Sequence, residues 1–145
     1  MNEVEAAIEI DAPVDVVWTV LTDFEQYSEW NPYITAASGA ATEGSRVEIR
    51  LTAQGGRTIR LAPQLDTVIE NEVLEWSAQY LAPRLFHERH TIELEPSDDA
   101  ETRVVQRVSF TGISADQMFS EASIRDGIEA MNQALKERTE SLVVL

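Results

Sequence analysis

Apolar residues recur along this chain at two spacings, and each spacing predicts a different element. At residues 3–10 every second side chain is apolar, which indicates a strand with one buried face. The same alternation returns from Tyr33 onward and predicts about six further antiparallel strands, separated by turn formers such as Gly55-Gly56 and Pro96-Ser97-Asp98-Asp99-Ala100. The segments that alternate most clearly are 47–51, 59–61, 65–70, 73–80, 86–95 and 102–111.

Helical spacing appears early in the chain and again at its end. Asp11-Ala12-Pro13 offers a capping acid and a first-turn proline, and the apolar stripe after it predicts a helix from about residue 13 to 22. A second helical segment is expected over 24–29, before Pro32 stops it. A long helix should begin between 115 and 123, because apolar residues then recur in steps of four, three, four and seven, at Ile124, Ile128, Met131, Leu135 and Leu142.

This order predicts an α+β fold in a single domain over residues 1–145. An antiparallel sheet and one long helix bury their apolar faces with the fewest elements when the sheet curves around the helix. The space between the two can be a cavity.

Composition narrows the classes of function. Twenty-six Asp and Glu against eleven Lys and Arg give a net charge of −15, which repels nucleic acid and anionic membranes and excludes nucleic acid as a partner. The scattered acids and the single lysine resemble proteins of salt-loving organisms. The absence of cysteine excludes disulfides, thiolate metal sites and a cysteine nucleophile. No secretory signal or membrane-spanning apolar run is evident, so a cytoplasmic protein without membrane insertion is expected.

The segment Asp23-Phe24-x-x-Tyr27-x-x-Trp30-Asn31-Pro32 resembles the signature of the START-like superfamily, also called SRPBCC, in its polyketide cyclase/dehydrase-like branch. Further matches follow in family order at Leu74-x-Trp76, His90-x-Ile92-x-Leu94-x-Pro96, Thr102, Phe110-x-Gly112 and Met131-Asn132-x-x-Leu135-Lys136. The resemblance implies a helix-grip fold, in which a curved sheet of about seven strands encloses a deep pocket for hydrophobic molecules beside the C-terminal helix. Superfamily members include lipid and sterol carriers, hormone receptors, aromatic cyclases and chaperone cofactors, so the fold does not decide the function.

The candidate site follows from alternation on the predicted hairpin. If Ile92 and Leu94 face inward, so do Phe86, Glu88 and His90, which places a carboxylate and an imidazole in apolar surroundings. On the second strand Gln106, Val108 and Phe110 face the same way, and a turn centred on Asp98 sets His90 opposite Gln106. Two interpretations stay open: these polar groups satisfy one another around a buried water, or they contact a ligand.

The remaining predicted ligand-binding residues surround this trio. Trp30 and Tyr33 are placed at a pocket mouth, and the other candidates are Ile49, Leu51, Trp76, Tyr80, Gly127, Ile128, Met131 and Leu135, for which plain core packing is the competing interpretation. No metal site or other cofactor is expected, because Glu88 and His90 lack a third ligand and His87 faces the opposite way. Lys136 lies off the buried stripe, where a solvated ammonium of ordinary pKa is a poor imine former.

Three functions are compatible with these residues. The first is a carrier or sensor that binds a lipid, sterol, polyketide-like or aromatic molecule in an enclosed cavity. The second is a cyclase or dehydratase in which His90, helped by Glu88 or Gln106, moves a proton in the same cavity. The third is an interaction protein similar to the chaperone cofactors, acting through its acidic surface. The apolar end from Leu142 to Leu145 leaves both a monomer and a homodimer open.

Overall fold

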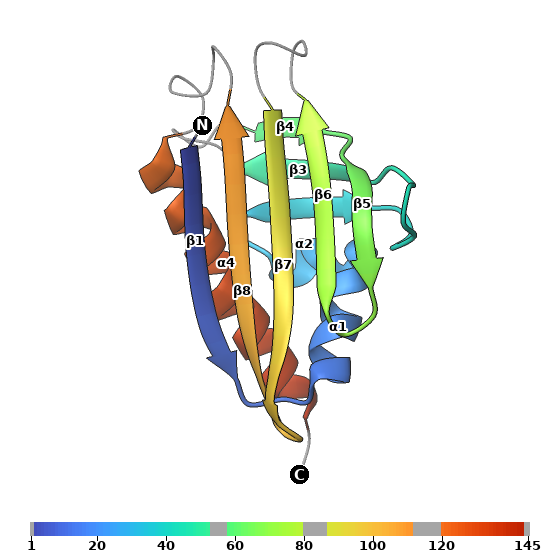
Figure 1. Ribbon diagram of the computed structural model, residues 1–145, viewed down its shortest axis with the longest axis vertical. Coiled ribbons are helices and arrows are strands. Elements are labelled where there is room, and N and C mark those ends of the chain that lie inside the picture. Colours follow the sequence, from blue (N-terminus) through green and yellow to red (C-terminus); the bar gives the residue numbers. More distant parts are fainter. Residues whose placement is uncertain (1, 53–57, 80–86, 112–119, 144–145) are drawn as a thin grey trace.

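The computed structural model describes residues 2–52, 58–79, 87–111 and 120–143 (Figure 1). Its first elements are β1 (Asn2–Ile10), helix α1 (Val14–Thr22), the 3-10 turn η1 (Phe24–Gln26) and the short helix α2 (Tyr27–Trp30). The strands that follow are β2 (Ile34–Ser38), β3 (Glu48–Thr52), β4 (Thr58–Leu61), β5 (Gln64–Ile69), β6 (Val73–Gln79), β7 (His87–Asp98) and β8 (Glu101–Thr111). Helix α4 (Glu121–Leu142) ends the described chain.

The strands form two antiparallel sheets that meet at one edge. The first has the order β1-β8-β7-β6-β5 and the second β2-β3-β4, and an isolated bridge from Arg46 to Gln64 joins them. The α+β helix-grip architecture is thus confirmed, although the single sheet of about seven strands becomes two sheets with eight strands among the described residues. Pro63 lies between β4 and β5, where its missing N–H ends one ladder and lets the chain change sheets.

Helix α4 packs against the concave face of the five-stranded sheet and along β1 (Figure 1). Ile124, Ile128, Met131 and Leu135 are buried as predicted, but the last stripe position, Leu142, is 53% exposed. Thr139 is buried in the next turn instead, with its hydroxyl donating to the Leu135 carbonyl oxygen at 2.6 Å. The helix therefore leaves the core about one turn before its end. No helix within the described part of the chain is long and apolar enough to cross a bilayer.

The helix starts are close to their predicted places. Ser120 caps α4, its Oγ accepting from the Ser123 N–H at 3.0 Å, inside the predicted window. At α1 the predicted Asp11 cap is wrong: Pro13 is the N-cap residue, and no side chain caps the helix. Asp11 lies too early to reach the first-turn N–H groups, and its own N–H donates to the Glu140 carboxylate at 2.8 Å.

The pairing of β7 with β8 differs from the prediction by two residues. His90 lies opposite Val108, and Gln106 lies opposite Ile92. The turn falls on Asp99 and Ala100 instead of Asp98, and the register shifts between Pro96 and Asp98. This irregularity in one strand displaces the turn while every side chain keeps its predicted face.

Candidate functional site

A chain of buried polar side chains crosses from the concave face of the sheet to α4. His90 Nε2 lies 2.6 Å from Gln106 Oε1, and Gln106 Nε2 donates to Asn132 Oδ1 at 2.7 Å. The three side chains are at most 2% exposed. Because the Gln106 amide nitrogen faces Asn132, its oxygen faces His90, and the imidazole proton is assigned to Nε2. His90 and Gln106 thus meet diagonally despite the shifted register.

Glu88 lies two residues before His90 on the same face of β7. It is 4% exposed, and burial raises the pKa of its carboxyl to about 7. The indole N–H of Trp76 opposes this rise by a smaller amount, but no hydrogen bond of ordinary geometry joins the two groups. Glu88 Oε2 and Trp76 Nε1 are therefore without partners among the described residues.

A third unpartnered polar atom belongs to the same region, the hydroxyl of Tyr33. Burial raises the pKa of the Tyr33 phenol well above its usual range, and the charge of nearby Glu88 adds to the rise. Buried polar groups in proteins nearly always have partners, so three unpaired atoms in one region need an explanation.

The position of Tyr33 depends on Asn31, from the family signature, and on Gly127 of α4. The Asn31 side-chain oxygen accepts from the backbone N–H of Tyr33 at 3.0 Å and of Ile34 at 2.9 Å. On α4, a β-carbon at Gly127 would lie 2.3 Å from Cδ1 of Tyr33, so only glycine leaves room for this ring. The Trp30-Asn31-Pro32 turn thus directs Tyr33 inward. The space that Gly127 leaves is filled by the Tyr33 ring, as the core-packing interpretation of Gly127 expects, and contact of Gly127 with a ligand stays a prediction.

Burial also reverses the usual order of titration of Glu88 and His90. It lowers the pKa of His90 to about 4, while the hydrogen bond to Gln106 raises it by less. The His90 ring lies 4.7 Å, centroid to centroid, from Trp76. At neutral pH the imidazole is therefore uncharged, and Glu88 is the group that titrates near pH 7.

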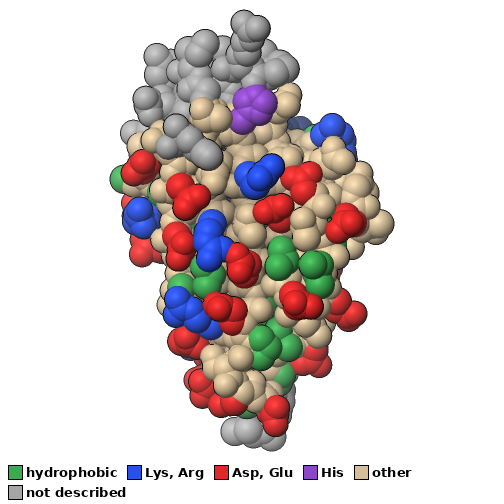
Figure 2. Space-filling model, in the orientation of Figure 1, with side chains coloured by type: hydrophobic (Ala, Val, Ile, Leu, Met, Phe, Trp, Pro, Cys, Tyr) green, Lys and Arg blue, Asp and Glu red, His purple; other side chains and the backbone are tan. Residues whose placement is uncertain are grey.

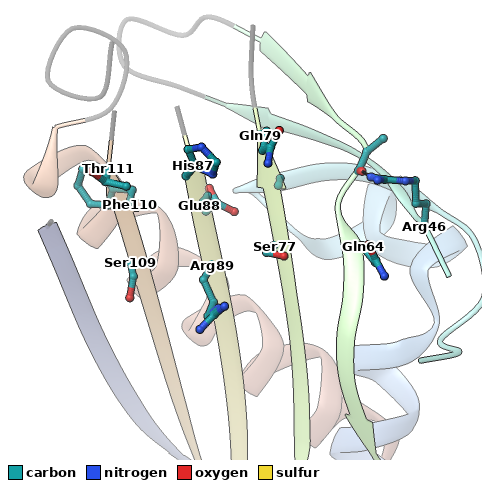
Figure 3. Close-up of a pocket in the computed structure, with 12 residues that line it drawn as sticks. Arg46, Gln64, Ser77, Gln79, His87, Glu88, Arg89, Ser109, Phe110 and Thr111 are labelled. Carbon is teal, nitrogen blue, oxygen red and sulfur yellow. Dashed lines mark hydrogen bonds between the residues drawn. The ribbon is translucent and has the colours of Figure 1, made fainter. Parts of the chain in front are cut away.

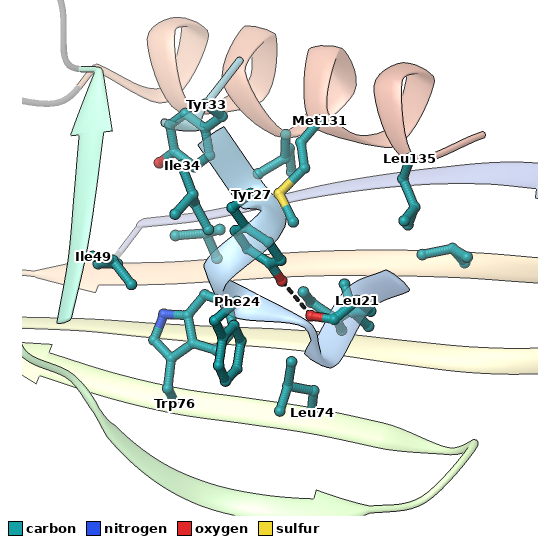
Figure 4. Packing of buried hydrophobic residues seen from close by; sticks show 14 of the residues in the cluster. Leu21, Phe24, Tyr27, Tyr33, Ile34, Ile49, Leu74, Trp76, Met131 and Leu135 are labelled. Atoms are coloured by element: carbon teal, nitrogen blue, oxygen red, sulfur yellow. Dashed lines mark hydrogen bonds between the residues drawn. The ribbon is translucent and has the colours of Figure 1, made fainter. Parts of the chain in front are cut away.

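Most predicted ligand-binding residues are buried in the hydrophobic core (Figure 4). Those buried there with Glu88, His90 and Gln106 are Tyr33, Ile49, Leu51, Trp76, Val108, Phe110, Ile128, Met131 and Leu135. Trp30 is half-buried, with its ring 5.1 Å from that of Tyr27. Tyr80 and Phe86 lie outside the described residues.

Two asparagines of the site, Asn31 and Asn132, were not predicted from the sequence as site residues. Asn132 follows Ile128 by four residues and so lies on the buried stripe of α4, a signal that a polar residue faces the core.

Lys136 also differs from expectation, because its pKa is raised, mainly by its hydrogen bond to Glu140 at 2.6 Å. A more firmly protonated amine is a still poorer imine former. Within the described ranges no group of three or more His, Asp or Glu side chains is placed to hold a metal ion.

Two hollows open on the outer faces of the sheets. One of about 690 Å³ crosses β5 to β8, and one of about 390 Å³ lies over β2, β3 and β4. The predicted lining residues share little with them: Glu88 and Phe110 border the first, and Ile49 the second. The enclosed cavity between sheet and helix stays a prediction.

The comparison with known families decides where this chain belongs. The family described as polyketide cyclase / dehydrase and lipid transport matches residues 1–141. The chain belongs to this family. None of the curated proteins matches it. Membership makes it a polyketide cyclase/dehydrase-like domain.

Solved structures of other proteins share the fold across nearly the whole chain. A START superfamily protein from Mycobacterium smegmatis is 18% identical, with a TM-score of 0.78 over 97% of this chain and 99% of its own. Protein MLL2253 from Mesorhizobium loti is 19% identical, with a TM-score of 0.75 over 99% and 100%. The ZhuI aromatase/cyclase from Streptomyces sp. R1128 is 18% identical, with a TM-score of 0.72 over 99% and 96%. At such identities the likeness shows the fold alone.

Proposed function

We propose that this domain binds a hydrophobic small molecule between the five-stranded sheet and α4, as a carrier or sensor, and receives the polar group of that molecule at Tyr33, Trp76 and Glu88. The supporting observation is the set of unpartnered polar atoms on Tyr33, Trp76 and Glu88, in an interior whose other polar side chains include the buried chain of His90, Gln106 and Asn132. Leaving a buried polar group unpaired costs about 1–3 kcal/mol, and a guest that pairs these atoms recovers part of that cost. The proposed ligands are a lipid, sterol, polyketide-like or aromatic molecule.

The chemistry of the three atoms narrows the polar group of the ligand. Trp76 Nε1 is a donor only, the Tyr33 hydroxyl donates or accepts, and the Glu88 carboxyl accepts and, when protonated, donates. A neutral hydroxyl or phenol satisfies this set. An anionic group does not, because it faces the Glu88 carboxylate in surroundings that disfavour charge.

Binding of a neutral fluorescent probe, N-phenyl-1-naphthylamine, tests this proposal with two tryptophan variants of α4. Met131→Trp enlarges a fully buried side chain beneath the sheet, whereas Leu142→Trp enlarges an exposed one on the same helix. We expect the first variant to lose probe fluorescence and the second to retain it, with circular dichroism confirming that both are folded. Equal uptake by the two variants would contradict binding between sheet and helix.

A cyclase or dehydratase activity is the second candidate. The pKa values of Glu88 and His90 favour it, but with Glu88 and not His90 as the group that transfers the proton. A proton-transferring group is most effective when its pKa is near the working pH, which describes Glu88 and not His90. Glu88 is then the acid or base, and His90 is a neutral group oriented by Gln106. The test is conversion of a poly-β-ketone: Glu88→Gln should abolish turnover while retaining binding of the probe, and unchanged turnover would rule out this role.

A further inference from the structure

We propose that the outer face of the five-stranded sheet carries a second binding site, for a small molecule that bears a carboxylate or phosphate group. The site is the hollow of about 690 Å³ over β5 to β8, on the opposite face from α4 (Figure 3). Its volume lies within the roughly 300–1,000 Å³ typical of small-molecule pockets. Six of the polar residues that line it are Arg46, Gln64, Ser77, His87, Arg89 and Ser109.

The pairing of the strands shows that these side chains form a row across the sheet. Gln64 lies opposite Ser77, Ser77 opposite Arg89, and Arg89 opposite Ser109. Directly opposed residues in a sheet present their side chains on the same face. Arg46 extends the row beyond Gln64 through the bridge that joins the two sheets. Arg89 is thus flanked on both sides by a serine hydroxyl.

The hollow differs in charge from the rest of the acidic surface, over which Figure 2 shows carboxylates scattered. Among the described residues of its lining the one acidic residue is Glu88, whose side chain is buried on the inner face. From β1, the Glu3 carboxylate accepts from the Ser109 hydroxyl at 3.2 Å. The described part of the lining therefore has more positive than negative side chains facing the hollow.

The arginines of the hollow also differ from their neighbours on the same face of the sheet. Arg103 pairs with Glu9 and Glu95, and Arg107 pairs with Glu5 and Glu93. Among the described residues, in contrast, Arg89 forms no ion pair or hydrogen bond.

Within the described segments, Arg46 donates to one acceptor, the backbone oxygen of Ala62 at 2.8 Å. A guanidinium presents a planar fork of donors that matches a carboxylate or phosphate, and the Ser77 hydroxyl adds a donor for a remaining oxygen, whereas that of Ser109 already donates to Glu3. Because the net charge of −15 repels anions at long range, the attraction is confined to short range and salt weakens it.

An NMR titration of the full chain with sodium phosphate and with sodium citrate, at ionic strength held constant with sodium chloride, tests this site. We expect saturable shifts of the backbone amides of Ser77, Arg89 and Ser109, and the anion that binds more tightly identifies the preferred group. Arg89→Gln should weaken binding by about tenfold or more, the usual effect of losing a charge-assisted hydrogen bond. The matched control is Arg103→Gln, on the same face but already neutralised, which should leave the affinity unchanged.

Three results would overturn the proposal. They are shifts that do not saturate, an affinity unchanged in Arg89→Gln, and an equal loss in Arg103→Gln. Shifts of the same amides that depend on protein concentration without added anion would instead show that carboxylates of a second copy fill the hollow. Because the site lies on the opposite face from α4, Met131→Trp should leave the titration unchanged, which separates this test from that of the interior.

Discussion

The aromatic ring of Tyr33 occupies the space that Gly127 leaves by lacking a side chain. A β-carbon on Gly127 would lie 2.3 Å from Cδ1 and 2.5 Å from Cε1 of the ring, far inside van der Waals contact. Gly127 lies within α4, where glycine is unfavourable by about 1 kcal/mol relative to alanine. The position of Tyr33 therefore depends on a residue that weakens the helix by itself.

Gly127→Ala should destabilise the protein, because overpacking a core costs about 1–3 kcal/mol and exceeds the gain in helix propensity. Urea unfolding measures the difference. In a Tyr33→Ala background the clash is absent, and the same substitution should raise the free energy of unfolding by up to about 1 kcal/mol. An equal loss of stability in both backgrounds would show that the ring is not the obstacle.

Glu88 should make the folded protein less stable as the pH rises from about 4.5 to 7. Its pKa is raised to about 7 in the folded state, so folding favours the protonated carboxyl. The contribution is complete below the unfolded pKa and is lost as the pH rises through the folded one, by on the order of 3 kcal/mol. Urea unfolding at pH 4.5, 6 and 8 should show Glu88→Gln gaining stability over the wild type toward pH 8. A constant difference would contradict the raised pKa.

His90 should have the opposite dependence. Its pKa is lowered to about 4, so its contribution is present above the unfolded value near 6.5 and is lost as the pH falls toward 4. The two contributions largely cancel in the wild type between about pH 4.5 and 6.5. Glu88→Gln removes one of them, so this variant should lose stability on acidification more steeply than the wild type. Direct titration of the imidazole by NMR measures the His90 pKa and checks the sign independently.

Asn132→Leu should cost about 1–3 kcal/mol, because it leaves the buried Gln106 side-chain amide without its acceptor. The matched control is Gln133→Leu, one residue further along α4 and exposed, which should change stability by less than about 0.5 kcal/mol. Chemical denaturation of both variants provides the comparison. Similar effects at the two positions would mean that the hydrogen-bond chain from His90 adds little to stability.

Predictions based on local periodicity agree with the structure. Side chains alternate strictly along a strand, so Glu88 and His90 share the buried face of β7 with its apolar residues, whichever strands lie beside β7. The stripe of α4 likewise identifies Ile124, Ile128 and Met131 as buried. Leu142, the last residue of α4, departs from the stripe and is exposed.

The pairing of β7 with β8 was predicted correctly, but its exact register was not. The β7–β8 register depends on an irregularity at Ser97 and a turn at Asp99 and Ala100, and turn formers at all these positions make several registers equally plausible. The sequence gives no signal of a role for the outward-facing His87 and Arg89, because a solvated strand face has the same pattern whether or not its charges have partners. Only the neighbouring strands show that Arg103 is neutralised and Arg89 is not.

The sequence by itself determined the element order, the inner face of each strand and the family signature, since all three depend on residues close together in the chain. The tertiary structure decided which distant residues meet: Tyr33 with Gly127, Gln106 with Asn132, and Arg89 with two serines from neighbouring strands. It also decided the charge states, because burial, which no local pattern measures, makes Glu88 a weaker acid and His90 a weaker base.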